Sequence, residues 1–181
     1  MVGFFIAVIS LSTATDVVQE RPFSNSDAEL SMKIDKAVAT RDEAKESCGT
    51  QEYEYSKETG SCYKIYRVHE IWSEANKTCA NDGAYLVILN DEHEAKIVVE
   101  MFSKESRLPA SWVGVRDDTG MGQWHSVHGD PMDKIYNVWH KYSTNLYVSE
   151  ACALLNPEGK LYDYYCNYYY HAICEKKPHV L

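Results

Sequence analysis

The six cysteines carry the most definite chemistry in the sequence: Cys48, Cys62, Cys79, Cys152, Cys166 and Cys174. Six cysteines in an oxidising compartment predict three disulfides. A metal cluster is disfavoured because the chain contains no Cys-x-x-Cys pair. Cys48 and Cys62 flank a turn-prone stretch, so we expect them to close a local hairpin, worth about 3 kcal/mol in the chain-entropy model. The cysteine count leaves the other pairings open.

A second group of chemically active side chains lies between Arg116 and Glu150, where regular patterning fades. A segment of this length without regular elements is typical of a binding loop. It holds His125, His128 and His140 but no His-Glu-x-x-His motif, and loop histidines are more often solvated than ligating, so zinc is not expected. The chain also lacks Gly-x-Ser-x-Gly, phosphate-loop and dinucleotide-binding motifs, so we predict no enzyme activity.

The N-terminal part of the chain predicts secretion. Residues 1–14 are apolar and uncharged and end in Ser-Thr-Ala, which favours a signal peptide cleaved near Ala14, although no Lys or Arg precedes the apolar core. A buried strand is the alternative. The stretch is shorter than the about 20 residues that a membrane span needs. We therefore expect a secreted, extracellular protein without a membrane span.

Residues 15–47 are polar and charged, and a short helix is expected from Ser26, where Leu30 and Ile34 recur at helical spacing. This segment could be a neck for self-association, but about two heptads are marginal for a coiled coil. A solvated tail is the favoured interpretation. The formal net charge of −9 and the absence of any basic run longer than Lys176-Lys177 argue against nucleic acid as a partner.

From Cys48 onward the hydrophobic pattern predicts alternating strands and helices. We expect strands at 60–66, 85–89, 112–115, 152–155, 161–166 and 171–175. A first helix should bury Trp72, Ala75 and Cys79, with Ser73 as its cap. Its Asn76-Lys77-Thr78 triplet is a glycosylation acceptor, although it lies near the buried face.

A second helix is predicted after Asp91, where Asp91 and Glu94 have the spacing of a capping box. Its buried stripe should consist of Ile97, Val98, Met101 and Phe102, and Pro109 should bound it.

Several ordered motifs resemble the C-type lectin domain in its long form. Trp72-x-x-Ala75-x-x-x-Cys79 resembles the first helix, Trp112-Val113-Gly114-Val115 resembles the central strand, and Glu150-Ala151-Cys152 and Cys166-x7-Cys174-Glu175 resemble the family's last motifs. The resemblance covers residues 48–175. Within the family, the general pattern of motifs is similar to insect haemolymph lectins that bind lipopolysaccharide.

This resemblance implies an α+β fold over residues 48–177, followed by a tail at 178–181. The expected architecture is two helices packed on small antiparallel sheets, with a long binding loop. It also implies three disulfides, which pair Cys79 with Cys174, Cys152 with Cys166, and Cys48 with Cys62.

The same resemblance implies a calcium site that has partly lost its ligands. Asn145, Glu150 and Asp163 match the family's ligand positions, whereas Ser143 stands where a carboxylate or amide is expected and Tyr162 where an asparagine is expected. Thr144 replaces the proline whose cis bond shapes the loop, and a non-proline cis bond costs about 2.5–4 kcal/mol.

A second calcium site of the family keeps only Asp117 and Glu150, because Leu146 and Ala151 occupy positions that are usually acidic. We expect calcium binding to be weak or absent. Asn145 and Glu150 could equally be ordinary solvated loop residues.

Aromatic side chains could bind a ligand where calcium does not. Tyr142, Tyr147 and Tyr162 offer flat rings that can pack against a sugar, and their hydroxyls can form hydrogen bonds. Trp124 and Trp139, in contrast, match core aromatic positions of the family.

Two functions remain open at the level of sequence. The first is a secreted lectin that binds glycans or lipopolysaccharide on microbial surfaces in innate immunity. The alternative is a calcium-independent, protein-binding C-type-lectin-like domain of an immune-modulating or venom component, because Tyr and Trp are also enriched at protein interfaces. An enzyme or enzyme inhibitor has no residue support.

Overall fold

A computed structural model describes residues 26–35, 48–49, 52–104, 109–143 and 151–178. The chain divides into two units, Met1–Val38 and Ala39–Leu181. In the first, residues 26–35 form the helix expected from Ser26; all are exposed, and Glu29 pairs with Lys33 at 2.7 Å. The predicted signal peptide and the rest of 15–47 lie outside the described residues. No helix within the described ranges is long and apolar enough to cross a membrane.

The second unit is built on a sheet in the order β1-β2-β8-β4-β6-β7, with β3 added on β8 and β5 on β4. The strands are β1 Glu54–Ser56, β2 Ser61–Glu70, β3 Tyr85–Leu86, β4 Ser111–Asp117, β5 His125–Ser126, β6 Ala151–Leu155, β7 Leu161–Tyr164 and β8 Tyr170–Lys176. All pairs are antiparallel except β4 with β8. The fold is the expected α+β one, but this parallel pair joins the strands into one sheet instead of separate small ones.

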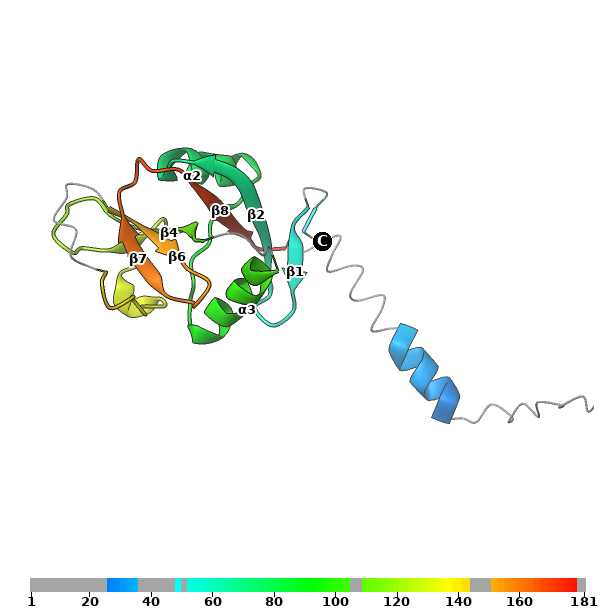
Figure 1. Cartoon of the computed structure of the whole chain (residues 1–181). Helices are drawn as coiled ribbons and strands as arrows, with labels where there is room; N and C mark the ends of the chain where they lie inside the picture. The colour runs from blue at the N-terminus through cyan, green and yellow to red at the C-terminus, as the bar shows by residue number, and fades with distance from the viewer. Residues whose placement is uncertain (1–25, 36–47, 50–51, 105–108, 144–150, 179–181) are drawn as a thin grey trace, which may run out of the picture. The chain divides into compact units, whose positions relative to one another are not determined.

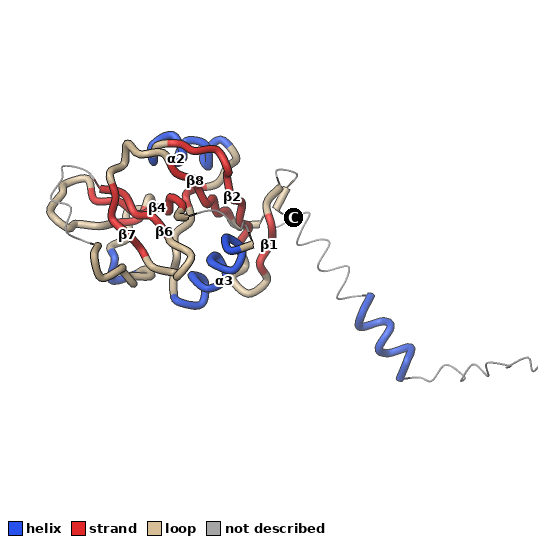
Figure 2. Tube along the Cα trace, viewed as in Figure 1, coloured by secondary structure: helices blue, strands red, loops and turns tan. Residues whose placement is uncertain are grey.

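Two helices, α2 (Trp72–Asn81) and α3 (Glu92–Ser103), lie on opposite sides of the β2–β8 pair (Figures 1 and 2). Successive strand residues face opposite sides of a sheet. Trp112 of β4 therefore packs in the core with Trp72 of α2, whereas Val113 packs in the core with Val98 of α3. The alternation of β4 gives each helix its own apolar face.

Several local predictions need correction. The strand expected at 85–89 covers only Tyr85–Leu86. Ile71, not Ser73, precedes α2, and no side chain caps this helix. Asp91 does cap α3, with its Oδ1 accepting from the amide of Glu94 at 2.8 Å.

The buried face of α3 also differs from the expected stripe. Val98 is buried and Met101 packs on the core, but Ile97 is only half-buried. Glu94 and Ala95 complete the buried face instead. Glu94 is held there because its carboxylate accepts hydrogen bonds from Asn90 and from the Tyr63 hydroxyl. Periodicity alone could not assign a charged residue to this face.

Three disulfides stabilise the second unit, and their pairing is the one that the resemblance implies: Cys48–Cys62, Cys79–Cys174 and Cys152–Cys166. Cys79–Cys174 ties α2 to β8, and Cys152–Cys166 ties β6 to the turn after β7. Glu175, which follows Cys174, is 1% exposed and accepts a hydrogen bond from Ser61 Oγ at 2.7 Å. Burial, more than any other cause, raises the pKa of the Glu175 carboxyl.

Candidate functional site

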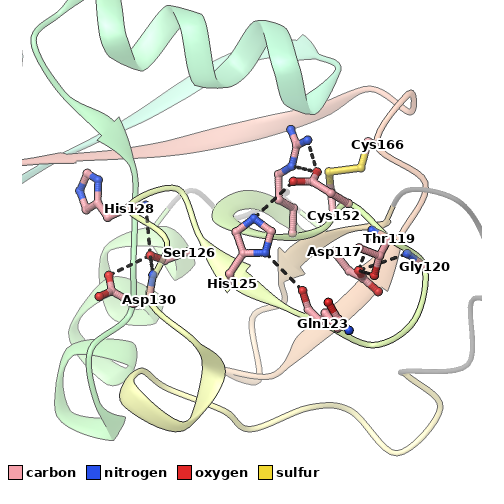
Figure 3. Close-up of polar contacts among 12 residues, drawn as sticks. Asp117, Thr119, Gly120, Gln123, His125, Ser126, His128, Asp130, Cys152 and Cys166 are labelled. Carbon is pink, nitrogen blue, oxygen red and sulfur yellow. Dashed lines mark hydrogen bonds and ion pairs between the residues drawn. A yellow bond between two sulfur atoms is a disulfide. The ribbon is translucent and has the colours of Figure 1, made fainter.

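The end of β4 carries a carboxylate that is almost fully engaged by its own loop. Asp117 is 2% exposed and accepts four hydrogen bonds. Three come from the amide and the hydroxyl of Thr119 at 2.9 and 2.7 Å and from the amide of Gly120 at 3.1 Å (Figure 3). The fourth comes from the amide of Gly122 at 2.7 Å. Burial alone would raise the pKa of Asp117, but these bonds outweigh it and lower the pKa below its usual value. A cation at this position would have to compete with these donors for the same lone pairs.

The rest of this loop is held by further polar contacts. Asp118 pairs with Arg116 and lies 3.3 Å from Nε2 of His125, and Ser126 Oγ donates to Asp130 at 2.9 Å (Figure 3). His128 packs edge-on against the ring of Tyr85. These loop histidines do not gather: within the described ranges there is no cluster of three or more potential metal ligands.

Ser143 is a structural residue in this fold. It is 5% exposed, its amide donates to the carbonyl of His140 at 2.8 Å, and its hydroxyl donates to the carbonyl of Leu161 at 3.4 Å. The side chain closes a turn onto β7. That Ser143 supplies no calcium ligand stays a prediction.

Tyr162 forms an aromatic platform with His140 and Tyr142. The amide of His140 donates to the carbonyl of Leu161 at 2.8 Å, which lays this segment along β7. The His140 ring then stacks on Tyr162 with centroids 4.3 Å apart and planes 18° apart, and it contacts Tyr142 at 5.3 Å. Tyr142 is 73% exposed, and Nζ of Lys141 lies 4.7 Å from its ring centroid.

The sequence indicates His140 only as a possible zinc ligand and does not predict its stacking on Tyr162. The parallel bridge between Trp139 and Leu161 brings it beside Tyr162. That contact joins distant parts of the chain, and no local pattern indicates it. Trp124 and Trp139 pack on the α3-side core, with ring centroids 4.7 Å apart, as expected for core aromatics.

The predicted calcium ligands are only partly within the described residues. Asp163 is 8% exposed in β7. Register places Asp163 opposite Ala153 of β6, and Asp117 opposite Ala151 of the same strand. The two carboxylate residues thus flank β6 near its start. Asn145, Tyr147, Glu150, Thr144 and Leu146 lie outside the described residues.

Further tyrosines form a second aromatic surface around the β7–β8 turn. Tyr164 contacts Tyr168 and Tyr170 edge-on, at 5.0 and 5.5 Å between centroids. Tyr165, Tyr168 and Tyr169 are 42%, 49% and 64% exposed. The exposed rings lie next to the Cys152–Cys166 disulfide in sequence, which fixes the start of the turn.

This fold and its disulfides define a C-type lectin-like domain. Residues 68–176 match the family model of the lectin C-type domain, so the chain belongs to that family. Human asialoglycoprotein receptor 2 is 30% identical over 124 residues, which cover 65% of this chain and 38% of the receptor. The hemolymph lipopolysaccharide-binding protein of Periplaneta americana is 28% identical over 132 residues, covering 68% and 51%. The chain spans about half or less of these two relatives.

Solved structures show the same fold. The C-type carbohydrate-recognition domain of cow CD23, in the presence of GlcNAc2Man3 oligosaccharide, superposes with a TM-score of 0.61 at 20% identity, over 72% of this chain and 97% of that one. A calcium-independent type II antifreeze protein superposes with a TM-score of 0.59 at 19% identity, over 72% and 95%. At these identities the likeness concerns the fold alone.

Proposed function

We propose that this protein is a secreted lectin that binds glycans on microbial surfaces through the aromatic platform of His140, Tyr142 and Tyr162, without catalysis. The observation that carries the proposal is the stack of His140 on Tyr162 beside the exposed ring of Tyr142. A flat, partly exposed aromatic surface can pack against the apolar face of a sugar ring, while hydroxyl and imidazole groups form hydrogen bonds to its hydroxyls. The similarity to a lipopolysaccharide-binding haemolymph protein supports a microbial glycan as the ligand.

Calcium has at most a minor role in this proposal. Hard cations need six to eight oxygen ligands. Asp117 already accepts four hydrogen bonds from its own loop, and Ser143 is buried in a turn. Asn145, Glu150 and Asp163 are the residues that would hold a calcium ion and supply the shared ligands for vicinal hydroxyls. These three side chains supply too few oxygen ligands for tight calcium binding.

The experiment is binding to a microbial glycan array, followed by competition with the free sugar. Tyr162→Ala should weaken glycan retention at least about fivefold, because stacking of a planar base on an aromatic ring is worth about 1–3 kcal/mol and a sugar face should lose a comparable contact. Tyr169→Ala, an exposed tyrosine outside the platform, is the matched control and should bind as wild type does. Unchanged retention by Tyr162→Ala would contradict the aromatic mechanism.

Secretion is tested separately. Protein recovered from the culture medium should lack Met1, since an intact N-terminus would contradict the proposed signal peptide.

A protein ligand is the second candidate, and the exposed rings of Tyr165, Tyr168 and Tyr169 favour it. Tyrosine is enriched at protein interfaces and their hot spots. The same array separates the two functions. Retention that the free sugar abolishes supports the lectin, whereas an array without sugar-competed binding supports a protein ligand.

A further inference from the structure

Two histidines that are 102 residues apart in sequence meet across the β2–β8 pair. His69 lies where the pairing register shifts, between Tyr66 and Glu70, and His171 is the second residue of β8. Their Nε2 atoms are 2.9 Å apart, and the ring centroids are 4.2 Å apart with planes inclined by 70°. In the absence of a ligand, one imidazole must donate its Nε2 proton to the other. The two Nε2 atoms thus meet between two neighbouring strands.

This separation is also that of two ligands on one metal ion. Imidazole nitrogens bind transition metals at about 2.0–2.1 Å, so two of them at a right angle lie about 2.9 Å apart, whereas a tetrahedral angle requires about 3.3 Å. The observed 2.9 Å matches the right angle. Right-angle nitrogen ligation is typical of tetragonal Cu²⁺ or Ni²⁺, and affinity for nitrogen sites peaks at Cu²⁺.

The two histidine side chains differ in their exposure to solvent, and this difference would let a metal ion reach the pair. His171 is 8% exposed and is fixed in the sheet, whereas His69 is exposed and reachable from solvent. The described part of the chain brings no third His, Cys, Asp or Glu to the pair, so water would complete the coordination. We propose that His69 and His171 form a bidentate site for a divalent transition-metal ion, with Cu²⁺ preferred. In the metal-bound form the donor ring carries its single proton on Nδ1 instead of Nε2, which leaves both Nε2 lone pairs for the metal.

The proposed site is separate from the aromatic platform. In the sheet order, β4 and β6 stand between β8 and β7, which carries Tyr162. Metal binding at the histidine pair and glycan binding at the platform can therefore succeed or fail independently. A metal bridging β2 and β8 would bind the folded chain and would stabilise it by a free energy that grows with the logarithm of the metal concentration above Kd.

The test titrates Cu²⁺ into the full chain, produced without a histidine tag, by calorimetry and by electron paramagnetic resonance. Wild type should bind one Cu²⁺ with a spectrum of two nitrogen ligands and should melt at a higher temperature with the metal. His69→Gln, which alters an exposed side chain, should bind at least about tenfold more weakly, because even outer-shell changes typically cost that much.

His93→Gln is the matched control, since His93 is an exposed histidine on α3, and it should bind Cu²⁺ as wild type does. Equal Cu²⁺ binding by wild type and His69→Gln would overturn the proposal. So would the absence of saturable binding by wild type, which would leave the pair as a hydrogen bond only.

Discussion

At the scale of the residue, the Asp117 carboxylate shows how one side chain can change its role without changing its type. Asp117 stands where the resemblance to the family implies a calcium ligand, but its carboxylate accepts four hydrogen bonds from its own loop. The residue type suggested a calcium ligand, and only the geometry shows which donors occupy its lone pairs. The turn depends on Gly120 and Gly122, which both have positive φ, at 66° and 78°.

Asp117 should make stability depend on acid pH. Its folded-state pKa is lowered, so its contribution is fully present above the unfolded pKa of about 3.9 and is lost as pH falls through the folded value. Hydrogen bonds to a charged group contribute about 1.5–3 kcal/mol. Urea unfolding between about pH 6 and pH 2 should therefore show Asp117→Asn less stable at pH 6 and converging with wild type in acid.

The neighbouring carboxylate supplies the control for this experiment. Asp118 is partly exposed and pairs with Arg116 and His125. Because exposed ion pairs contribute about 0–1 kcal/mol, Asp118→Asn should cost less than Asp117→Asn at pH 6. A difference between Asp117→Asn and wild type that stays constant down to pH 2 would show that the carboxylate's charge is not what stabilises the loop.

At the scale of the element, β4 explains why its motif contains a glycine. A Cβ at Gly114 would lie 2.3 Å from the backbone oxygen of Leu86. The Gly114 amide donates to Val87 and its carbonyl accepts from Val127, both at 2.8 Å. The backbone of β4 is thus pressed between the segment after β3 and the segment after β5.

Gly114→Ala should therefore destabilise the fold by about 1–3 kcal/mol or more, because overpacking against backbone cannot be relieved by a side-chain rotation. The control is Gly60→Ala, where no atom lies within 4 Å and only the positive φ of 65° opposes a side chain. It should cost about 1 kcal/mol. Thermal melts of both variants measure the difference, and a Gly114→Ala protein as stable as wild type would refute the close packing.

The sequence predicted most of the helices and strands but not the long-range contacts between them. Alternation located β2, and helical spacing located α2 and α3, which each bury one face. A short apolar run located β4, whose two faces lie in the two cores. The resemblance implied the cysteine pairing. Local patterns failed where the contact is long-range: the parallel β4–β8 pair, the buried Glu94 under Tyr63, the His140–Tyr162 stack and the His69–His171 pair. Each of these depends on which strands become neighbours, which composition and periodicity do not encode.

At the scale of the whole molecule, the residues that stabilise the fold are distinct from the loop residues that could bind a ligand. Three disulfides and two cores on opposite faces of the sheet hold the fold. The loop residues are therefore free to change without loss of the frame, and a similar fold is found in a calcium-independent antifreeze protein. The stability of this chain should accordingly be insensitive to calcium.

The measurement is a thermal melt of the mature protein with calcium and then with a chelator. A native-state ligand adds about 2.7 kcal/mol at a hundredfold excess over its Kd, a shift of roughly 5–10 °C for a domain of this size. We expect no resolved shift for wild type, because Ser143 and Tyr162 stand where the resemblance to the family implies an acidic or amide ligand. A variant combining Ser143→Glu, Thr144→Pro and Tyr162→Asn restores the family's ligand positions and serves as the positive control for a calcium-dependent rise. A clear rise in wild type that the chelator reverses would instead mean that Asn145, Glu150 and Asp163 suffice for a site, and a calcium-bridged sugar would replace the aromatic platform as the mode of binding.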